Sequence, residues 1–199
     1  MRALRCSARP LGSPRRGRGR DPWRPNLSPR LPAVRLVAGL LLMVAAALVQ
    51  VTWAAQLEIA GAFANLVLIA VVGLTWTQGV RAGLLWACAG GILLDLNAPG
   101  PLGPHALALL AGAYATGFWA RNLDRESPFH PVAAVVVSTI LYSLVLIGAD
   151  DALGLPIPPF RTAVQLTLAA SLYNAALMPL ALMALRRVTG GLHWEQTAA

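Results

Sequence analysis

The chain has 199 residues, of which 57% are hydrophobic and only 12% are charged, and its mean hydropathy is +0.62. Soluble domains carry about 25% charged residues, so this composition excludes a water-soluble globular protein. The net charge of +8 does not indicate nucleic-acid binding, because ten of the sixteen basic residues lie before Leu36 and the others flank apolar stretches.

Residues 1–32 form a basic segment rich in Arg, Pro and Gly. Its prolines are too closely spaced for a helix, so we expect a disordered cytoplasmic tail. A secretory signal peptide is the less favoured alternative, since the basic region is long and only the alanines at 45–47 or 54–55 resemble a cleavage site. An over-extended reading frame is a further alternative. We expect residues 189–199 to form a second, short cytoplasmic tail.

Residues 33–188 alternate apolar runs with short polar breaks, which predicts one domain: an all-α, polytopic transmembrane bundle of about six helices. About 20 residues are needed to cross roughly 30 Å of hydrocarbon. The run at 82–96 would reach only about 22 Å, so it either spans a thinned bilayer or is partly re-entrant. We favour spanning on the charge pattern. The expected spans are 33–53, 57–76, 82–96, 102–120, 132–149 and 162–185.

The arginines that follow the tail are unevenly distributed between the two sides of such a bundle. With the tail inside, six crossings leave only Arg161 on the outer side. This asymmetry follows the positive-inside rule, and it predicts a multi-pass protein of the cytoplasmic membrane with both termini in the cytoplasm. The arginines expected on the inner side are Arg81, Arg121, Arg125, Arg186 and Arg187.

Small residues recur at helical spacing in the third and fourth expected helices. Helices in lipid associate by close backbone approach and by interhelical hydrogen bonds, so these stripes should face other helices. We expect the two helices to pack against each other in antiparallel fashion. The residues are Gly83, Ala87, Gly91 and Asp95 in the third helix, and Ala108, Gly112 and Thr116 in the fourth.

A polar stripe marks one face of the last expected helix. We expect ordinary polar packing inside the bundle for this stripe. Pro179 removes a backbone donor and should kink this helix. The stripe consists of Thr167, Ser171, Asn174 and Met178.

Asp95 is the one acidic residue close to an apolar core. An intramembrane carboxylate is a candidate functional group by default, yet Asp95 lies near the outer end of its expected helix, within reach of interfacial water. Two interpretations stay open: a structural cap or loop anchor, and a site with a partner. The candidate partners are His105, Arg161 and the backbone donors around 100–103.

Motifs of enzyme chemistry are absent from the sequence. It has no G-x-S-x-G elbow, H-E-x-x-H pair or Walker loop, and Ser138, Ser143 and Ser171 have no His and acid at matching depth. His105 has no second His, Cys or carboxylate three or four residues later to complete a metal pair. We therefore expect no catalytic residue, metal or cofactor.

A set of short motifs extends from the second expected helix to the last. Asn65 follows Ala64 at the start of an apolar run, and residues 91–96 read Gly-Ile-Leu-Leu-Asp-Leu. After a turn, Leu102, Gly103 and His105 open the next run, in which Tyr114 follows Ala113. Asn174, Pro179 and the basic pair Arg186–Arg187 belong to the last run. In order and spacing these motifs resemble the rod shape-determining protein MreD family.

The resemblance implies a non-enzymatic membrane component of the bacterial cell-elongation machinery, involved in rod shape and lateral peptidoglycan synthesis. The implied partners are an MreC-like protein and, through it, an MreB-like actin, a RodA-like glycosyltransferase and a class B penicillin-binding protein. The family is also similar in fold to the substrate-binding subunits of energy-coupling-factor vitamin transporters. A small-molecule transporter subunit is therefore the alternative function, and it would require a polar, ligand-sized pocket open to the outside.

Overall fold

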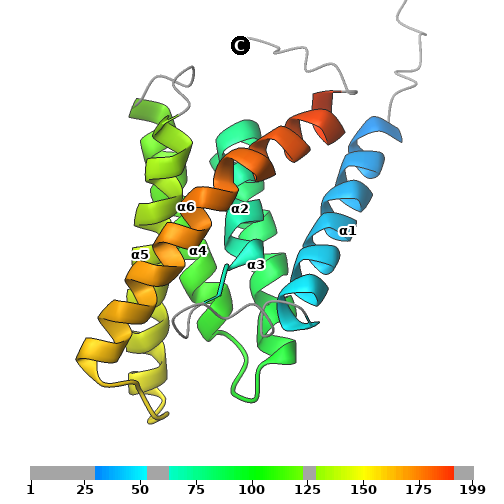
Figure 1. Ribbon diagram of the computed structural model, residues 1–199. Coiled ribbons are helices and arrows are strands. Elements are labelled where there is room, and N and C mark those ends of the chain that lie inside the picture. Colours follow the sequence, from blue (N-terminus) through cyan, green and yellow to red (C-terminus); the bar gives the residue numbers. More distant parts are fainter. Residues whose placement is uncertain (1–29, 53–62, 123–128, 191–199) are drawn as a thin grey trace, which may run out of the picture.

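The computed structural model describes residues 30–52, 63–122 and 129–190. Within these ranges the chain folds into helices without any strand, so the predicted all-α helical bundle is confirmed (Figure 1). Most of the two predicted tails lies outside the described residues, although the first and last helices extend a short way into them. The helices are α1 Arg30–Thr52, α2 Leu66–Gln78, α3 Val80–Asn97, α4 Pro104–Asn122, α5 Phe129–Ala152 and α6 Phe160–Gly190.

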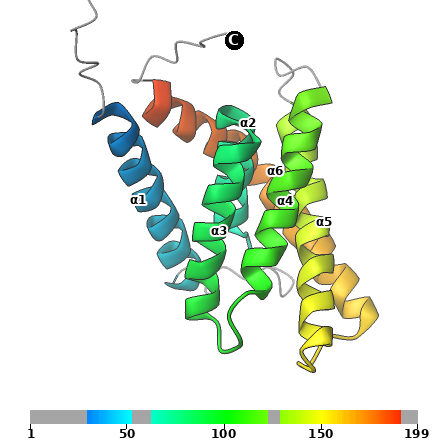
Figure 2. The same cartoon turned by 180° about the vertical axis from the view of Figure 1, so that it is seen from behind.

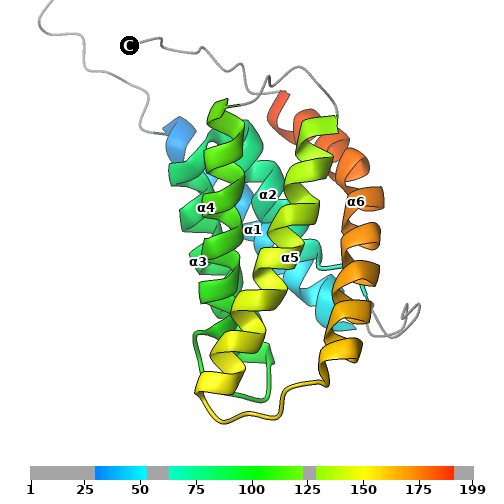
Figure 3. The ribbon, with the colours of Figure 1, turned by 90° about the vertical axis from the view of Figure 1, so that its left-hand side faces the viewer.

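Helix α2 is the centre of the bundle and contacts each of the other five helices (Figures 1 and 3). Its sequence, LVLIAVVGLTWTQ, is apolar on every face, and a helix that is hydrophobic all round is one that other helices surround. The residues between Val67 and Trp76 are accordingly buried, apart from the half-buried Ala70. The core of the described residues is therefore built around α2.

The short helix of the bundle is α2, whereas the sequence predicted that the next helix, at 82–96, would be the short one. Of the predicted span 57–76, residues 57–62 lie outside the described residues, residues 63–65 are not helical, and the helix begins at Leu66. With 13 residues it is about 20 Å long. The physical reason is a cap: the Asn65 side chain accepts a hydrogen bond from the Leu68 amide and ends the preceding non-helical stretch. Hydropathy does not register such a cap.

Helix α3 is correspondingly longer than the predicted run 82–96. A turn at Gly79, whose φ of +91° suits a residue without a Cβ, lets α3 begin directly after α2. With 18 residues, α3 joins α5 and the Phe160–Arg187 part of α6 as helices of the described chain that are long and apolar enough to cross a membrane.

The distribution of polarity is inverted relative to a water-soluble protein. Leu41, Leu85 and Leu172 are more than 60% exposed on the outer surface, and other large apolar side chains of the same helices are exposed as well. Asn174 and Ser138, by contrast, are fully buried. Contiguous exposed apolar surface of this kind marks contact with lipid or protein, so the bundle is suited to a membrane.

The two ends of the bundle differ in their basic residues. The start of α1, the α2–α3 turn, the end of α4 and the end of α6 lie at one end, which we call the arginine end (Figure 1). The α3–α4 turn and the α5–α6 connection lie at the other, which we call the Asp95 end (Figure 1). Arg161, in the first turn of α6, is at the Asp95 end. The described arginines at the arginine end include Arg81, Arg121, Arg186 and Arg187.

Small residues set how closely the helices approach. Helices α3 and α4 share the most extensive contact in the bundle and lie side by side (Figure 2). A Cβ added at Gly91 would overlap the backbone of Ala106 in α4, so this contact requires glycine. The expected antiparallel packing of the two helices is confirmed, but two glycines of the stripes face other helices. Gly83 faces Thr75 of α2, whereas Gly112 of α4 lies against Leu68 of α2 and Ser138 of α5.

Candidate functional site

Asp95 is a cap on the start of α4, supplied by the end of α3. Its Oδ2 accepts hydrogen bonds from the amides of Gly103 at 2.9 Å and Ala106 at 3.2 Å, and its Oδ1 accepts one from the His105 amide at 3.0 Å. The first N–H groups of a helix have no partner inside the helix, and Pro104 has no N–H to satisfy. One carboxylate therefore satisfies each amide from Gly103 to Ala106 that can donate.

His105 completes the surroundings of the carboxylate. Its Nδ1 lies 3.1 Å from Asp95 Oδ1, and its ring packs edge-on against Tyr142 of α5 with 6.3 Å between ring centroids. The Asp95 side chain is 1% exposed. Of the two interpretations of Asp95, this geometry favours the structural anchor. The proposed partner Arg161 lies exposed at the start of α6 and is not bound to Asp95 in the described chain.

The start of α2 is capped in a different way, by uncharged side-chain amides from the residue before it and from two other helices. The Asn65 side chain accepts from the Leu68 amide at 2.9 Å. Gln50 of α1 accepts from the Val67 amide at 3.1 Å. Asn174 of α6 accepts from the Asn65 amide at 2.9 Å. Non-helical backbone at membrane depth is tolerated only where protein satisfies it, and these contacts meet that requirement at the start of α2.

Asn174 also links α6 to α5. Its Nδ2 donates to the Thr139 hydroxyl at 2.9 Å, and that hydroxyl donates to the Val135 carbonyl at 2.7 Å. Asn174 is fully buried, and the Tyr142 hydroxyl lies near the Asn65 side chain. The start of α2, the middle of α5 and the middle of α6 thus share one hydrogen-bonded cluster, which we call the amide cluster: Asn65, Thr139 and Asn174.

A third polar contact joins α4 to α5. The hydroxyls of Thr116 and Ser138 lie 2.8 Å apart, with either able to donate to the other, and both lie within hydrogen-bond distance of the Gly112 carbonyl, at 2.9 and 3.1 Å respectively. The three residues are buried. Buried hydroxyls satisfied in this way hold helices together without exposing a polar group to lipid.

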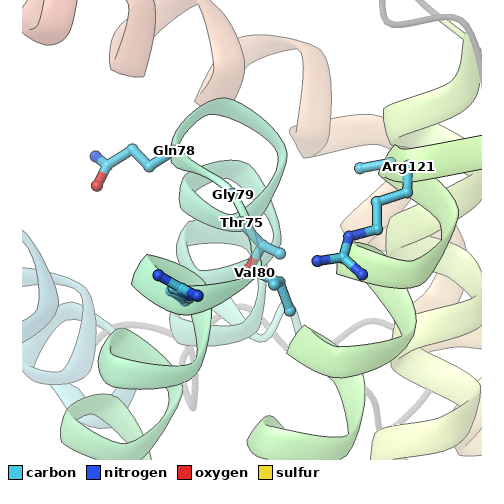
Figure 4. A pocket seen from close by; sticks show the side chains of 8 residues that line it. Thr75, Gln78, Gly79, Val80 and Arg121 are labelled. Atoms are coloured by element: carbon cyan, nitrogen blue, oxygen red, sulfur yellow. The ribbon is translucent and has the colours of Figure 1, made fainter. Parts of the chain in front are cut away.

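A hollow of about 310 Å³ lies at the arginine end, between the α2–α3 turn and the last turn of α4. The Arg121 side chain extends from α4 toward Val80 at the start of α3 (Figure 4). Arg81 lies one residue further along α3 and also lines the hollow. The remaining lining residues are Thr75, Gln78, Gly79, Gly117 and Ala120.

The structure brings several of the sequence-predicted residues together and separates others. Gly91, Asp95, Gly103 and His105 meet at the α3–α4 anchor. Asn65 and Asn174, which are 109 residues apart, meet in the amide cluster. Ala87 and Gly83 are buried along α3, away from both contacts. Those that lie exposed on the outer surface are Leu102, Tyr114 and Pro179.

Sequence reasoning missed four residues of these contacts. Gln50, Ser138, Thr139 and Tyr142 each contact a signature residue or its helix. A weak signal exists for Thr139 and Ser138, since adjacent hydroxyl residues interrupt the apolar run of α5. Gln50 carries none, because a polar residue near a helix end is ordinary.

The comparisons with known proteins give no match. No family model, no curated protein and no solved structure matches this chain. The resemblance to the MreD family therefore rests on the motifs in the sequence.

Proposed function

We propose that this chain is a non-enzymatic integral membrane component of the bacterial cell-elongation machinery, acting in rod shape and lateral peptidoglycan synthesis. The observation that carries the proposal is that the motif residues contact one another and hold the helices together. Gly91, Asp95, Gly103 and His105 form one anchor, and Asn65 and Asn174 form the other. The motifs resemble those of the MreD family, and in this chain they cap helices and join them to one another. Such structural roles are what a scaffold protein requires.

The commitment of Asp95 supports a scaffold over a catalyst. A general acid or base must reach the proton that it transfers, and this carboxylate is buried with each oxygen already accepting from α4. The partners proposed from the resemblance are an MreC-like protein and, through it, an MreB-like actin, a RodA-like glycosyltransferase and a class B penicillin-binding protein. These would dock on the apolar outer surface or on the helix ends.

The proposed orientation places the arginine end in the cytoplasm, because positive residues are retained on that side. Reporter fusions after Gln78, Leu123 and Ala199 should then report a cytoplasmic location, and fusions after Ala98 and Leu155 an external one. An external signal from the fusion after Leu123 would mean that α3 and α4 cross the membrane in the opposite direction. That result would contradict the proposed orientation.

Depletion in the rod-shaped bacterium that encodes the chain tests the function. Cells should round or swell as the protein is lost, and the wild-type chain should restore the rod. Asp95→Leu should fail to restore it, whereas Asp151→Asn, which alters an exposed acid on α5, should succeed. Normal shape with a vitamin requirement would contradict the elongation role and favour the transporter alternative.

The hollow does not by itself favour the transporter. That function requires a polar pocket open to the outside, and the hollow lies at the end proposed to be cytoplasmic. Among the polar groups at the Asp95 end, Asp95 is bound to α4 and Asn97 donates to the Leu93 carbonyl. Uptake measurements with the depleted cells separate the two functions directly.

A further inference from the structure

We propose that the hollow at the α2–α3 turn binds the phosphate group of an anionic phospholipid. The proposal depends on the membrane placement of the bundle and is independent of a role in wall growth. It starts from the two arginines that line one cavity from different helices, Arg81 on α3 and Arg121 on α4.

The charges of these arginines are not neutralised by the described residues. Both arginines are exposed, and the contact between a basic and an acidic side chain found in the described chain, His105 with Asp95, is at the opposite end. An arginine guanidinium forms paired, charge-assisted hydrogen bonds with phosphate oxygens. Two such groups lining one cavity provide positive charge and hydrogen-bond donors, which are what a phosphate requires.

The amides at the start of α3 add to this preference, whereas the last turns of α2 and α4, which also line the hollow, present carbonyls that oppose it. Gly79 caps α3 without a side-chain hydrogen bond, and the first turn of α3 contains no acidic residue. The amides of a helix start favour an anion. Gly79 also keeps the approach open, since no atom lies within 4 Å of the position where a Cβ would stand. This feature supports the arginine pair and would not suffice without it.

The volume of the hollow and its position at the end of the bundle favour a lipid over a free ion. The cavity of about 310 Å³ exceeds the space that a phosphate alone needs, and it lies at the end of the bundle, where a headgroup would be. On the exposed faces, Leu85 follows Arg81 by four residues and Phe118 precedes Arg121 by three. These spacings place an apolar side chain one turn deeper than each arginine. Acyl chains would contact that apolar surface while the phosphate meets the arginines.

Lipid titration of the purified full-length chain in a neutral detergent, followed by native mass spectrometry, tests the proposal. The probes are phosphatidylglycerol and the zwitterionic phosphatidylcholine. We expect phosphatidylglycerol to bind about tenfold more tightly. Arg81→Gln with Arg121→Gln should weaken its binding by about tenfold or more per arginine, which is the usual contribution of a charge-assisted hydrogen bond.

The matched control removes the same charge from the same end of the bundle. Arg186→Gln with Arg187→Gln alters two exposed arginines of α6 that do not line the hollow, and it should change binding by less than about twofold. Equal losses in the two double variants would show general charge attraction and overturn the site. Unchanged binding in the hollow variant would overturn it as well.

Two further measurements keep the result decisive. Arg81→Lys with Arg121→Lys retains the charge but loses the planar fork, so it should weaken binding severalfold. Unchanged binding in this variant would contradict recognition by the guanidinium groups. This conclusion would stand even if the glutamine variant failed to fold. Glycerol phosphate and inorganic phosphate serve as soluble competitors. Displacement of the lipid by either compound at millimolar concentration would assign the hollow to a free phosphate. That result would contradict the proposal that its occupant is a lipid.

Discussion

The starts of α4 and α2 are both capped inside the bundle, but by opposite means. At α4, a charged carboxylate from a residue only 8–11 positions earlier binds the amides. At α2, neutral amide side chains do so, and two of them come from other helices, 17 and 109 residues away. The first contact can form within a two-helix hairpin, whereas the second requires the first and last helices of the bundle.

The difference shows where a membrane bundle can use a charge. Asp95 lies in the last turn of α3, next to the α3–α4 turn at the end of the bundle. Asn174 lies in the middle of α6 and is fully buried, where an ionised group would be costly. An amide meets the same need for an acceptor without that cost, although each bond contributes less.

The largest effect is expected from separating α4 from its carboxylate. Gly91→Leu would insert a side chain where a Cβ already overlaps the backbone of Ala106, whose amide binds Asp95. We expect a loss of about 3 kcal/mol of stability or more, since overpacking costs about 1–3 kcal/mol and hydrogen bonds are lost as well.

Denaturation of the purified protein in mixed detergent measures this loss. Gly148→Leu is the matched control, because a Cβ at Gly148 of α5 meets no atom within 4 Å, and it should be close to neutral. Equal stability of the two variants would show that α3 and α4 do not depend on close contact.

A smaller effect is expected from keeping the shape of Asp95 while changing its acceptors. In Asp95→Asn, one side of the group becomes a donor that faces amide donors of α4, so bonds to one oxygen are lost. We expect destabilisation by about 2 kcal/mol, the range for a hydrogen bond to a charged group. Asp95→Leu should cost more. Asp151→Asn should be neutral in the same denaturation measurement, and a neutral Asp95→Asn would show that the charge is unnecessary for capping.

The neutral cap should be weaker. Asn174→Ala removes the bonds to the Asn65 amide and to the Thr139 hydroxyl, and hydrogen bonds between membrane helices contribute about 0.6 kcal/mol on average and about 1.7 at most. We expect a loss of about 1 kcal/mol. A double-mutant cycle with Thr139→Ala isolates the α5–α6 contact. Should Asn174→Ala cost more than Asp95→Leu, the ranking of the two caps is reversed.

The smallest effect is expected on the outer surface. Leu41→Ala changes a side chain of α1 that is 64% exposed, and lipid can fill the space, so the cost should be about 0.5 kcal/mol or less. Met43→Ala, two residues later and fully buried, should cost about 2 kcal/mol or more. Comparable losses would show that the outer face of α1 is covered by protein, and melting temperatures in detergent suffice for the measurement.

Much of the fold follows from the sequence, because apolar runs and small residues report directly on helices and close contacts. The α3–α4 anchor could be suggested from the sequence for another reason, because Asp95 and the Gly103–His105 turn are close together in the sequence. Two things were not accessible. The cap at Asn65 shortens α2 within a continuous apolar run, and hydropathy averages over it. Gln50 binds the Val67 amide and Thr139 binds Asn174, from helices whose relative rotation the sequence does not specify, so these two residues could not be assigned.

The partners of Asn65 also impose an order on synthesis. The Asn65 amide finds its acceptor on Asn174, which the ribosome adds 109 residues later. At about 5–20 residues per second, the interval is roughly 5–20 s. During that time the hairpin of α3 and α4 can already be complete, while the start of the central helix waits for its last partner. A nascent chain that ends before α6 therefore lacks the acceptor for the Asn65 amide, immediately before the start of α2.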